Sequence, residues 1–363
     1  MLKNYYRYPT EIVEDIFGES PKLAETIFAT TRVEAPRMFI AADYNVVNRH
    51  EGLGAKIGRY VREHGIGIAG SPEVFSGGEK VKADGMQSLQ ALAGAMLEAK
   101  LGAGDCVVAI GGGTVLDLAG YAAAQVRGGV KLVRVPTTPA AMIDAAFAEY
   151  AAIDSQNVKD AMRVASVPEA VLTDLAFAPT VLDGVWRAGF GEAIRLAVAL
   201  DASLFKKLLN LVEGVKARDD GAMREAIELS VEARLKRGNT NLGLWSAIRL
   251  ESMSGYKLPH GYAVPMGICV DANYAVARGL LKPEVRDEIV GALANSGALD
   301  GMLHSQHLVG QIDRILYGLD AWKLTNGVGE ITLPTGIGKS TTEAEPDREL
   351  FGQAIKEAMA VFK

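Results

Sequence analysis

The sequence predicts an N-terminal α/β domain with a mostly parallel sheet, followed by an all-helical domain. Three observations favour this fold class. Short apolar runs alternate with helical patterns in the first half of the chain, and helical patterns dominate the second half. With 363 residues, the chain also exceeds what one compact core usually accommodates. We expect the α/β domain to span residues 1–178 and the helical domain residues 179–363.

Three apolar runs in the first half are typical of buried strands: residues 38–42, 107–110 and 132–135. Alanine- and leucine-rich helical patterns cover residues 86–100 and 116–127. Such alternation indicates a parallel sheet covered by helices, and ligands of such sheets bind beyond the carboxyl ends of the strands. Each run is followed by polar or glycine residues suited to that role.

Helical patterns recur through the second half. The expected helices are residues 187–200, 202–217, 222–237, 261–277, 284–294 and 346–361. One strand-like segment, residues 330–333, precedes a proline. Because no long linker separates the halves, we expect the two domains to pack with a cleft between them.

Composition narrows the function classes. The formal net charge of −6 argues against binding nucleic acid or an anionic membrane, because either would require a basic surface. Two cysteines cannot build a disulfide framework, and the first residues lack the apolar core of a signal peptide. Together with 40 glycines, these features are typical of a cytoplasmic enzyme.

Three glycine-rich segments resemble phosphate-binding loops, and one of them has the right context. Residues 65–70 follow a helical pattern instead of a strand, and residues 336–340 lack the first glycine of a P-loop, so both are interpreted as turns. Residues 111–120 follow a buried strand directly and run into a helix. Three bare glycines there would let a pyrophosphate approach the helix N-terminus. The alternative is a tight turn without a ligand.

Several motifs occur in order along most of the chain. They are Gly-Glu-Lys-Val-Lys at 78–82, the glycine turn at 111–120, Val-Pro-Thr-Thr at 135–138, Gly-Glu-Ala-Ile-Arg at 191–195, Asn-Leu-Gly at 241–243 and Leu-Pro-His-Gly at 258–261. Together they resemble the dehydroquinate synthase family of sugar-phosphate cyclases. The resemblance implies a Rossmann-like NAD-binding domain, a helical domain for metal and substrate, and a homodimer.

The resemblance also implies where NAD would bind. The positions are Asp43, Asn45, Glu79, Lys82, Gly112, Gly113, Thr114, Asp117, Thr137, Thr138 and Lys159. Two placements have independent physical support. Asp43 ends an expected strand, where a carboxylate can accept a ribose hydroxyl, and the threonine pair ends another strand, where hydroxyls can reach a phosphate or an amide.

The metal position departs from the family. Its members bind a divalent ion, zinc or cobalt, through one glutamate and two histidines. Glu192 and His260 match two of these ligands, whereas Leu244 stands at the third position and has no lone pair to offer. A second histidine of the same stretch, which handles substrate phosphate and protons in the family, is Ile248 here. For His260, a packing role at a turn is the alternative.

The substrate side departs as well. Tyr150 stands where the family has a lysine that touches substrate, Asp160 replaces an asparagine, and Arg195 replaces a lysine. The residues that the resemblance still implies as catalytic are Asp144, Lys159, Glu192, Arg195, Asn241, His260 and Arg127.

These features favour an NAD-dependent sugar-phosphate cyclase-like enzyme of the carbon–oxygen lyase type, with an altered substrate and a weakened or lost metal site. Its substrate would be a sugar phosphate or a polyol, and neither nucleic acid nor membrane would be a partner. Two alternatives stay open. One is an NAD-dependent polyol or hydroxy-acid dehydrogenase on the same scaffold, and the other is an NAD-binding homologue without turnover.

Overall fold

The computed structural model describes residues 8–78, 81, 85–156, 158–301, 308, 310–326 and 329–360. The chain divides into two compact units, one that extends to Val181 and one that begins at Leu182. The first is an α/β unit and the second is mainly helical, which confirms the predicted fold class. Among the described residues, no helix combines the length and the hydropathy needed to span a bilayer.

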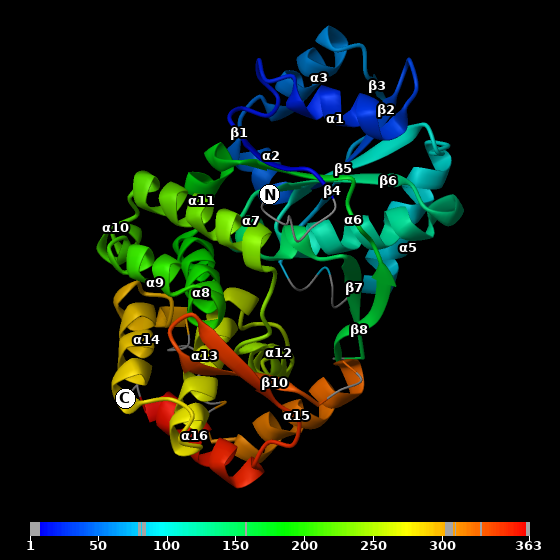
Figure 1. Ribbon diagram of the computed structural model, residues 1–363. Coiled ribbons are helices and arrows are strands. Elements are labelled where there is room, and N and C mark those ends of the chain that lie inside the picture. The colour runs from blue at the N-terminus through cyan, green and yellow to red at the C-terminus, as the bar shows by residue number, and fades with distance from the viewer. Residues whose placement is uncertain are drawn as a thin grey trace. The chain divides into compact units, whose positions relative to one another are not determined.

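A parallel sheet forms the centre of the α/β unit (Figure 1). Its strands are β1 (Thr10–Val13), β2 (Arg37–Asp43), β3 (Gly67–Ile68), β4 (Glu73–Phe75), β5 (Asp105–Gly111), β6 (Lys131–Pro136) and β9 (Ala170–Asp174). Their order is β1-β9-β6-β5-β2-β3, with β4 also paired to β2, and every described pair is parallel. Strand β5 is buried along its whole length, which explains its unbroken apolar sequence.

Helices cover both faces of this sheet (Figure 1). On one face lie α1 (Lys22–Thr31) and α3 (Leu53–Glu63), joined by the Tyr60 hydroxyl, which accepts from the Ala24 amide and donates to the Ser20 carbonyl. On the other lie α5 (Gly85–Glu98) and α6 (Gly113–Gln125). Shorter elements complete the unit: α2 (Tyr44–Arg49), α7 (Pro139–Ile143), the turns η1 (Val126–Gly128), η2 (Ala145–Phe147) and η3 (Leu175–Thr180), and an antiparallel hairpin of β7 (Tyr150–Ser155) and β8 (Val158–Ala165).

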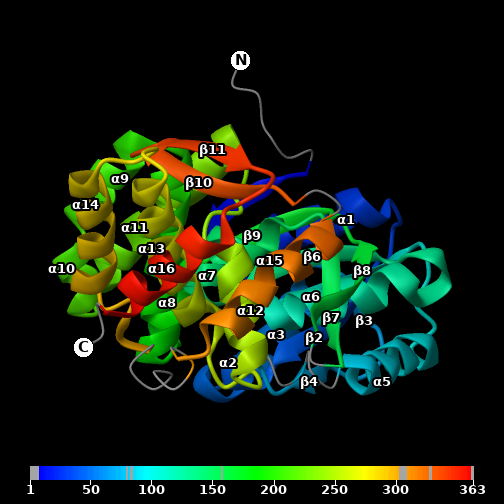
Figure 2. The same ribbon diagram turned by 90° about the horizontal axis from the view of Figure 1, so that it is seen from below.

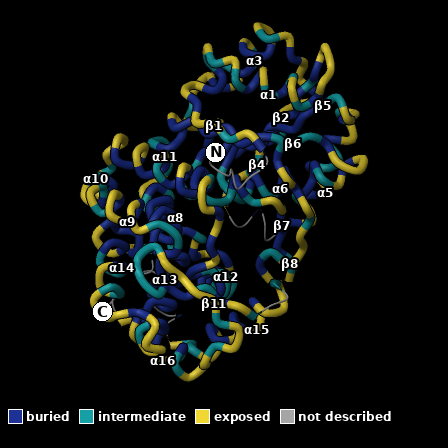
Figure 3. The backbone as a smooth tube through the Cα atoms, viewed as in Figure 1, coloured by how far each residue is buried: buried dark blue, intermediate teal, exposed yellow. Residues whose placement is uncertain are grey.

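The second unit is a helical bundle with one small hairpin. Its helices are α8 (Asp183–Leu200), α9 (Ala202–Leu209), α10 (Val212–Lys216), α11 (Asp220–Arg237), α12 (Leu244–Met253), α13 (His260–Ala277), α14 (Pro283–Asn295), α15 (Ile312–Asn326) and α16 (Arg348–Ala360). Helices α8 and α13 are buried over most of their length (Figure 3), in keeping with their largely apolar sequences. The hairpin of β10 (Ile331–Gly336) and β11 (Lys339–Glu343) packs against both (Figure 2).

One sequence expectation about the helical unit needed correction. The single helix expected at residues 202–217 is two helices, because the chain tightens into i→i+3 hydrogen bonds at Asn210 and Leu211 and interrupts α9 before α10 begins. The strand expected at 330–333 is confirmed as β10, which forms one arm of the β10–β11 hairpin. Of the two glycine decoys, residues 65–70 contain the two-residue strand β3 within the connection from α3 to β4, and residues 336–340 include the hairpin turn, as expected.

Close backbone contact fixes α13 against the start of α12. A Cβ atom on Gly267 of α13 would lie 2.0 Å from the carbonyl oxygen of Gly243. Gly243 itself has a φ of +77°, a conformation that side chains other than glycine rarely adopt. The backbones therefore touch only because both positions are glycine.

We predict that Gly267→Ala destabilises the protein by about 1–3 kcal/mol, because the new methyl group meets backbone that cannot move aside. Gly291→Ala is the matched control, since Gly291 lies inside α14 and a Cβ there has no neighbour within 4 Å. That control should be neutral or stabilising, as alanine favours a helix over glycine by up to ~1 kcal/mol. Urea unfolding compares the two variants, and equal stabilities would refute the packing argument.

Candidate functional site

The carboxyl edge of the sheet gathers most of the predicted cofactor residues. Strand β2 ends at Asp43, β5 ends at Gly111, and β6 leads into Thr137 and Thr138. Because β2, β5 and β6 are parallel neighbours, these ends lie side by side. The first helical turn after β5 therefore opens beside a carboxylate on one side and two hydroxyls on the other.

The glycine turn after β5 is a bare helix N-terminus. Gly112 is the N-cap of α6, in an extended conformation, and no side chain caps the helix. The first N–H groups of a helix have no partner within it, so they remain available to an anion. A Cβ on Gly112 would lie 3.2 Å from the Thr138 Cγ2 atom, and one on Gly113 would lie 3.0 Å from the Ala145 Cβ atom. Side chains would thus begin to fill this cradle.

Asp43 does more than end a strand. Its Oδ1 atom accepts from the backbone and side-chain nitrogens of Asn45 at 2.8 and 3.0 Å, which caps α2. Its other oxygen faces Gly77, where a Cβ would lie only 2.1 Å away. The structure therefore brings together the predicted pair Asp43 and Asn45 and adds Gly77, whose missing side chain makes room for the carboxylate.

The two predicted threonines have different roles. The Thr138 hydroxyl accepts from the Ala141 amide and caps α7. Thr137 is buried, and its Oγ1 atom has no hydrogen-bond partner among the described residues. An unsatisfied buried hydroxyl beside the glycine turn is the kind of group that a bound ligand satisfies. Asp144 lies at the end of α7, on the same side of the unit.

A buried arginine anchors the β7–β8 hairpin, which carries Lys159. The Arg134 guanidinium, fully buried in β6, donates to the carbonyls of Ala146, Ala148 and Ser166. These three residues lead into β7 and out of β8, so both ends of the hairpin are fixed to the sheet. Lys159 is itself buried. Sequence reasoning did not identify Arg134.

Tyr150, at the start of this hairpin, is a neutral phenol at neutral pH. Partial burial raises its pKa above the ordinary value of 10, and the carboxylate of Asp160 raises it further, with smaller effects from Asp117 and Asp144. The Arg163 guanidinium, 4.9 Å above the ring, opposes the shift. Several carboxylates therefore lie near Tyr150, which stands at the position where the resembled family has a lysine.

The remaining predicted residues of this unit lie at different places. Thr114 and Asp117 lie on the first turns of α6, next to the glycines. Arg127 lies exposed beyond the other end of α6, about 20 Å from the glycine turn by the rise of a 13-residue helix. Within one chain, Arg127 is therefore not brought together with the glycine turn. Glu79 and Lys82 lie outside the described residues.

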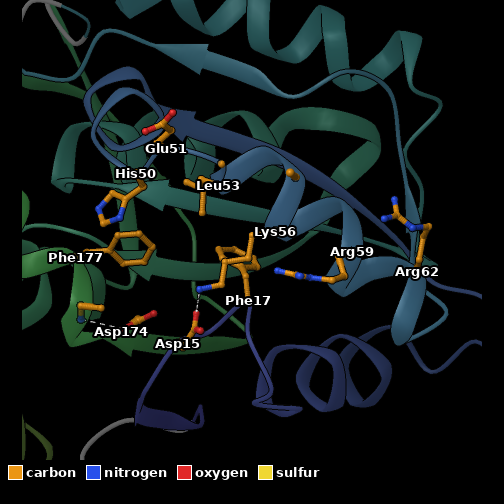
Figure 4. Close-up of a pocket in the computed structure, with 13 residues that line it drawn as sticks. Asp15, Phe17, His50, Glu51, Leu53, Lys56, Arg59, Arg62, Asp174 and Phe177 are labelled. Atoms are coloured by element: carbon orange, nitrogen blue, oxygen red, sulfur yellow. Dashed lines mark hydrogen bonds and ion pairs between the residues drawn. The ribbon is translucent and has the colours of Figure 1, made fainter.

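A cavity of about 780 Å³ opens elsewhere in this unit (Figure 4). It lies between the segment after β1, the start of α3 and the start of η3. Phe17, Leu53 and Phe177 form its apolar wall, and Lys56 pairs with Asp15 at its edge. The predicted cofactor residues do not line it, so it is not the predicted site.

In the helical unit, Glu192 and Arg195 form a buried ion pair. Both lie on α8 and each side chain is only 1% exposed. Arg195 Nε donates to Glu192 Oε2 at 2.7 Å, and its Nη1 atom donates to the Thr240 carbonyl. The other glutamate oxygen, Oε1, is buried and has no hydrogen-bond partner among the described residues.

His260 faces that free oxygen. Its Nε2 atom lies 3.7 Å from Glu192 Oε1, and its Nδ1 atom donates to Glu251 Oε1 at 2.7 Å. Glu251, on α12, is fully buried. The predicted pair of Glu192 and His260 is therefore brought together. Glu251 was missed, although a carboxylate in an apolar helix pattern nine residues before a histidine is a signal that could have indicated it.

Two residues at the positions of the family's other histidines are apolar. Leu244 and Ile248 lie on the first turns of α12 and are half-buried, and Asn241 just before them is exposed. Among the described residues, no group of three histidine, cysteine, aspartate or glutamate side chains converges on one point. The site offers two candidate metal donors, Glu192 Oε1 and His260 Nε2.

A buried aspartate holds the turn from Asn241 to Leu244. Asp271 of α13 accepts from the Gly243 amide at 2.6 Å and from Trp245 Nε1 at 2.8 Å. Burial raises the pKa of its carboxyl from 3.8 to about 7, although these two hydrogen bonds act in the opposite direction. Sequence reasoning did not identify this residue.

Comparison with known proteins gives consistent results for both units. The model of the 3-dehydroquinate synthase N-terminal domain matches residues 73–187, and that of the C-terminal domain matches residues 189–309. Together these matches cover more than half of the chain. The 3-dehydroquinate synthase of Pyrobaculum neutrophilum is 30% identical over 282 residues, which are 72% of this chain and 81% of the relative.

Solved structures share the fold. The 2-epi-5-epi-valiolone synthase of Streptomyces hygroscopicus, solved with NAD+ and Zn2+, superposes with a TM-score of 0.83 at 22% identity, covering 98% of each chain. A 2-deoxy-scyllo-inosose synthase, solved with carbaglucose-6-phosphate, NAD+ and Co2+, gives 0.77 at 18% identity over 96% of each chain.

We predict that Asp271→Asn flattens the pH dependence of stability. Between about pH 4 and 7 the folded wild type keeps a proton that the unfolded chain has released, so its free energy of unfolding falls as the pH rises. The slope is at most about 1.4 kcal/mol per pH unit. In urea unfolding at pH 5 and pH 7, the wild type should lose more stability than the variant, by on the order of 2 kcal/mol.

The variant also loses one acceptor, since an amide oxygen cannot serve both donors as a carboxylate does. This cost of about 1–3 kcal/mol is independent of pH and so cancels when the two pH values are compared. Equal changes in wild type and variant would contradict the raised pKa.

Proposed function

The chain belongs to the 3-dehydroquinate synthase family, as its motifs predicted, and from this we propose that it is an NAD-dependent sugar-phosphate cyclase-like enzyme with an altered substrate. One observation supports this most: the bare glycine turn occurs in the same chain as two candidate metal donors, the buried Glu192 Oε1 and Nε2 of the part-buried His260, which lie 3.7 Å apart. A homodimer stays a prediction.

The glycine turn fits NAD. Its backbone N–H groups suit the pyrophosphate, the Asp43 carboxylate suits a ribose hydroxyl, and the unsatisfied Thr137 hydroxyl suits a polar group of the dinucleotide. NAD, when bound, supplies a hydride acceptor and later a hydride donor. The residues of the chain bind and orient it, and the lack of side chains at Gly112 and Gly113 keeps the cradle open.

Glu192 and His260 fit a divalent ion as two ligands. Two atoms that each lie about 2.0–2.2 Å from one ion can be no more than about 4.4 Å apart, and the observed separation is 3.7 Å. The free glutamate oxygen gives the ion an anionic partner. A bound ion would polarise a substrate hydroxyl, and substrate oxygens or water would take the positions that Leu244 leaves open. The metal-bound solved relatives support this assignment.

The proposal of an altered substrate is supported by residues of the β7–β8 hairpin and, separately, by a residue of α12. Tyr150 offers a neutral hydroxyl instead of an ammonium group, Asp160 brings a negative charge, and Ile248 offers no donor. Each change weakens the binding of an anionic group. We therefore propose a polyhydroxylated substrate, a sugar phosphate or a polyol, that bears less negative charge at these points than the substrate of a typical family member.

Cyclase and dehydrogenase activity differ in the fate of the hydride. A cyclase returns the hydride to its intermediate, so NADH does not accumulate, whereas a dehydrogenase releases NADH in step with product. With the purified protein, NAD, zinc and a panel of sugar phosphates and polyols, we expect substrate loss without net NADH. Stoichiometric NADH would establish the dehydrogenase, and tight NAD binding without any turnover would establish the non-catalytic homologue.

We predict that Gly112→Ala raises the Kd for NAD about tenfold or more. The added methyl group occupies the cradle and disturbs hydrogen bonds to a charged phosphate, each worth about 1.5–3 kcal/mol. Gly94→Ala is the control, because Gly94 lies in α5 and a Cβ there has no neighbour within 4 Å. Calorimetric titration with NAD measures both variants. Unchanged affinity in Gly112→Ala would exclude the turn as the NAD site.

A further inference from the structure

Glu251 is a carboxylate with no exposure to solvent in the apolar part of a helical bundle. Removing a carboxylate from water costs several kcal/mol unless hydrogen bonds or a charge compensate. Its Oε1 atom accepts from His260 Nδ1 at 2.7 Å, a short and well-placed contact. The buried Glu251 carboxylate thus has a specific partner in the part-buried His260.

The chain between α12 and α13 is built to keep this pair in register. The Glu251 carbonyl accepts from the Ser254 hydroxyl at 2.7 Å and from the Tyr256 amide at 3.0 Å. The Ser254 hydroxyl in turn accepts from the Leu258 amide at 3.0 Å. These bonds close the connection onto the last turn of α12, so the distance from Glu251 to His260 is set by the backbone.

The contact also determines which ring nitrogen of His260 carries the proton. A proton held on Nδ1 by a carboxylate leaves the lone pair on Nε2. Nε2 is the atom that lies 3.7 Å from the unpartnered Glu192 Oε1. On the far side, Arg195 holds the other glutamate oxygen at 2.7 Å. Each of the two donors is therefore oriented by a buried neighbour that is not itself a ligand.

We propose that Glu251 is a positioning residue for the metal site: it fixes His260 so that two protein ligands suffice where Leu244 supplies none. This inference rests on the proposed function, because it presupposes that Glu192 and His260 hold an ion. A side chain that must be ordered when the ion binds lowers the affinity for the ion. With only two protein ligands, we expect the orientation of each ligand before binding to matter more.

Zinc titration of metal-free protein by calorimetry tests the proposal, with Glu251→Gln as the variant. Glutamine has nearly the same shape but no charge, and loss of such an outer partner weakens metal binding about 10–100-fold. Glu343→Gln is the matched control, because Glu343 is a part-buried carboxylate of the same unit that pairs with Arg278. The control should bind zinc like the wild type, and equal zinc affinity in all three proteins would overturn the proposal.

A spectroscopic measurement separates positioning from a purely structural role. In zinc-loaded wild type, nitrogen-15 NMR of the five histidines should show one ring with a strongly hydrogen-bonded Nδ1 proton, and His260→Gln should remove that signal. Glu251→Gln should shift it while the thermal unfolding midpoint changes little. If Glu251→Gln fails to fold, the wild-type signal decides: its absence overturns the proposal.

Failure of the wild type to bind zinc would overturn both this inference and the metal site, whereas the NAD titration reports separately on the cofactor.

Discussion

The contact between α8 and α13 is the constraint on which the helical site depends. A Cβ on Gly261 would lie 2.1 Å from that of Ala188, and one on Gly191 would lie 2.7 Å from the Pro265 ring. The two helices therefore approach more closely than side chains would permit. Since Glu192 follows Gly191 directly and His260 precedes Gly261, this approach brings the two donors to within 3.7 Å. The short distance between Glu192 and His260 therefore depends on the glycines at the contact between α8 and α13.

The α/β unit uses glycine in a related way. At the carboxyl edge of its sheet, Gly77 makes room for the Asp43 carboxylate, and Gly112 and Gly113 leave the α6 N-terminus open. Gly111 has a different role, because a Cβ there would lie 2.7 Å from that of Val115 and would separate the strand from its helix. Of the three consecutive glycines, one serves packing and two keep backbone accessible. In both units, small residues determine where polar groups can act.

Much of this could be predicted from the sequence, and the rest had a common physical reason for being missed. The strands β2, β5 and β6 and the long helices follow from apolar periodicity, and their order predicts the carboxyl-edge site. By contrast, Arg134, Glu251 and Asp271 act through contacts with residues distant in sequence or across a turn, and the sequence alone does not show which partner satisfies a buried charged residue. The distance of Arg127 from the glycine turn likewise depends on α6, which separates the two. The sequence predicts this helix, but the direction in which it runs from the sheet comes from the structure.

The buried ionic groups of the helical unit argue for a functional role over a structural one. Replacing a buried ion pair by apolar residues of similar volume is often neutral or stabilising, so such pairs are poor devices for stability alone. Here Glu192 and Arg195 form a buried pair, Glu251 is buried against the part-buried His260, and one oxygen of Glu192 has no hydrogen-bond partner among the described residues. A buried oxygen without a partner costs stability, and a bound cation would offset that cost. Leu244 supplies no ligand, whereas the unsatisfied glutamate oxygen is retained, and this combination supports the proposal of a two-donor metal site.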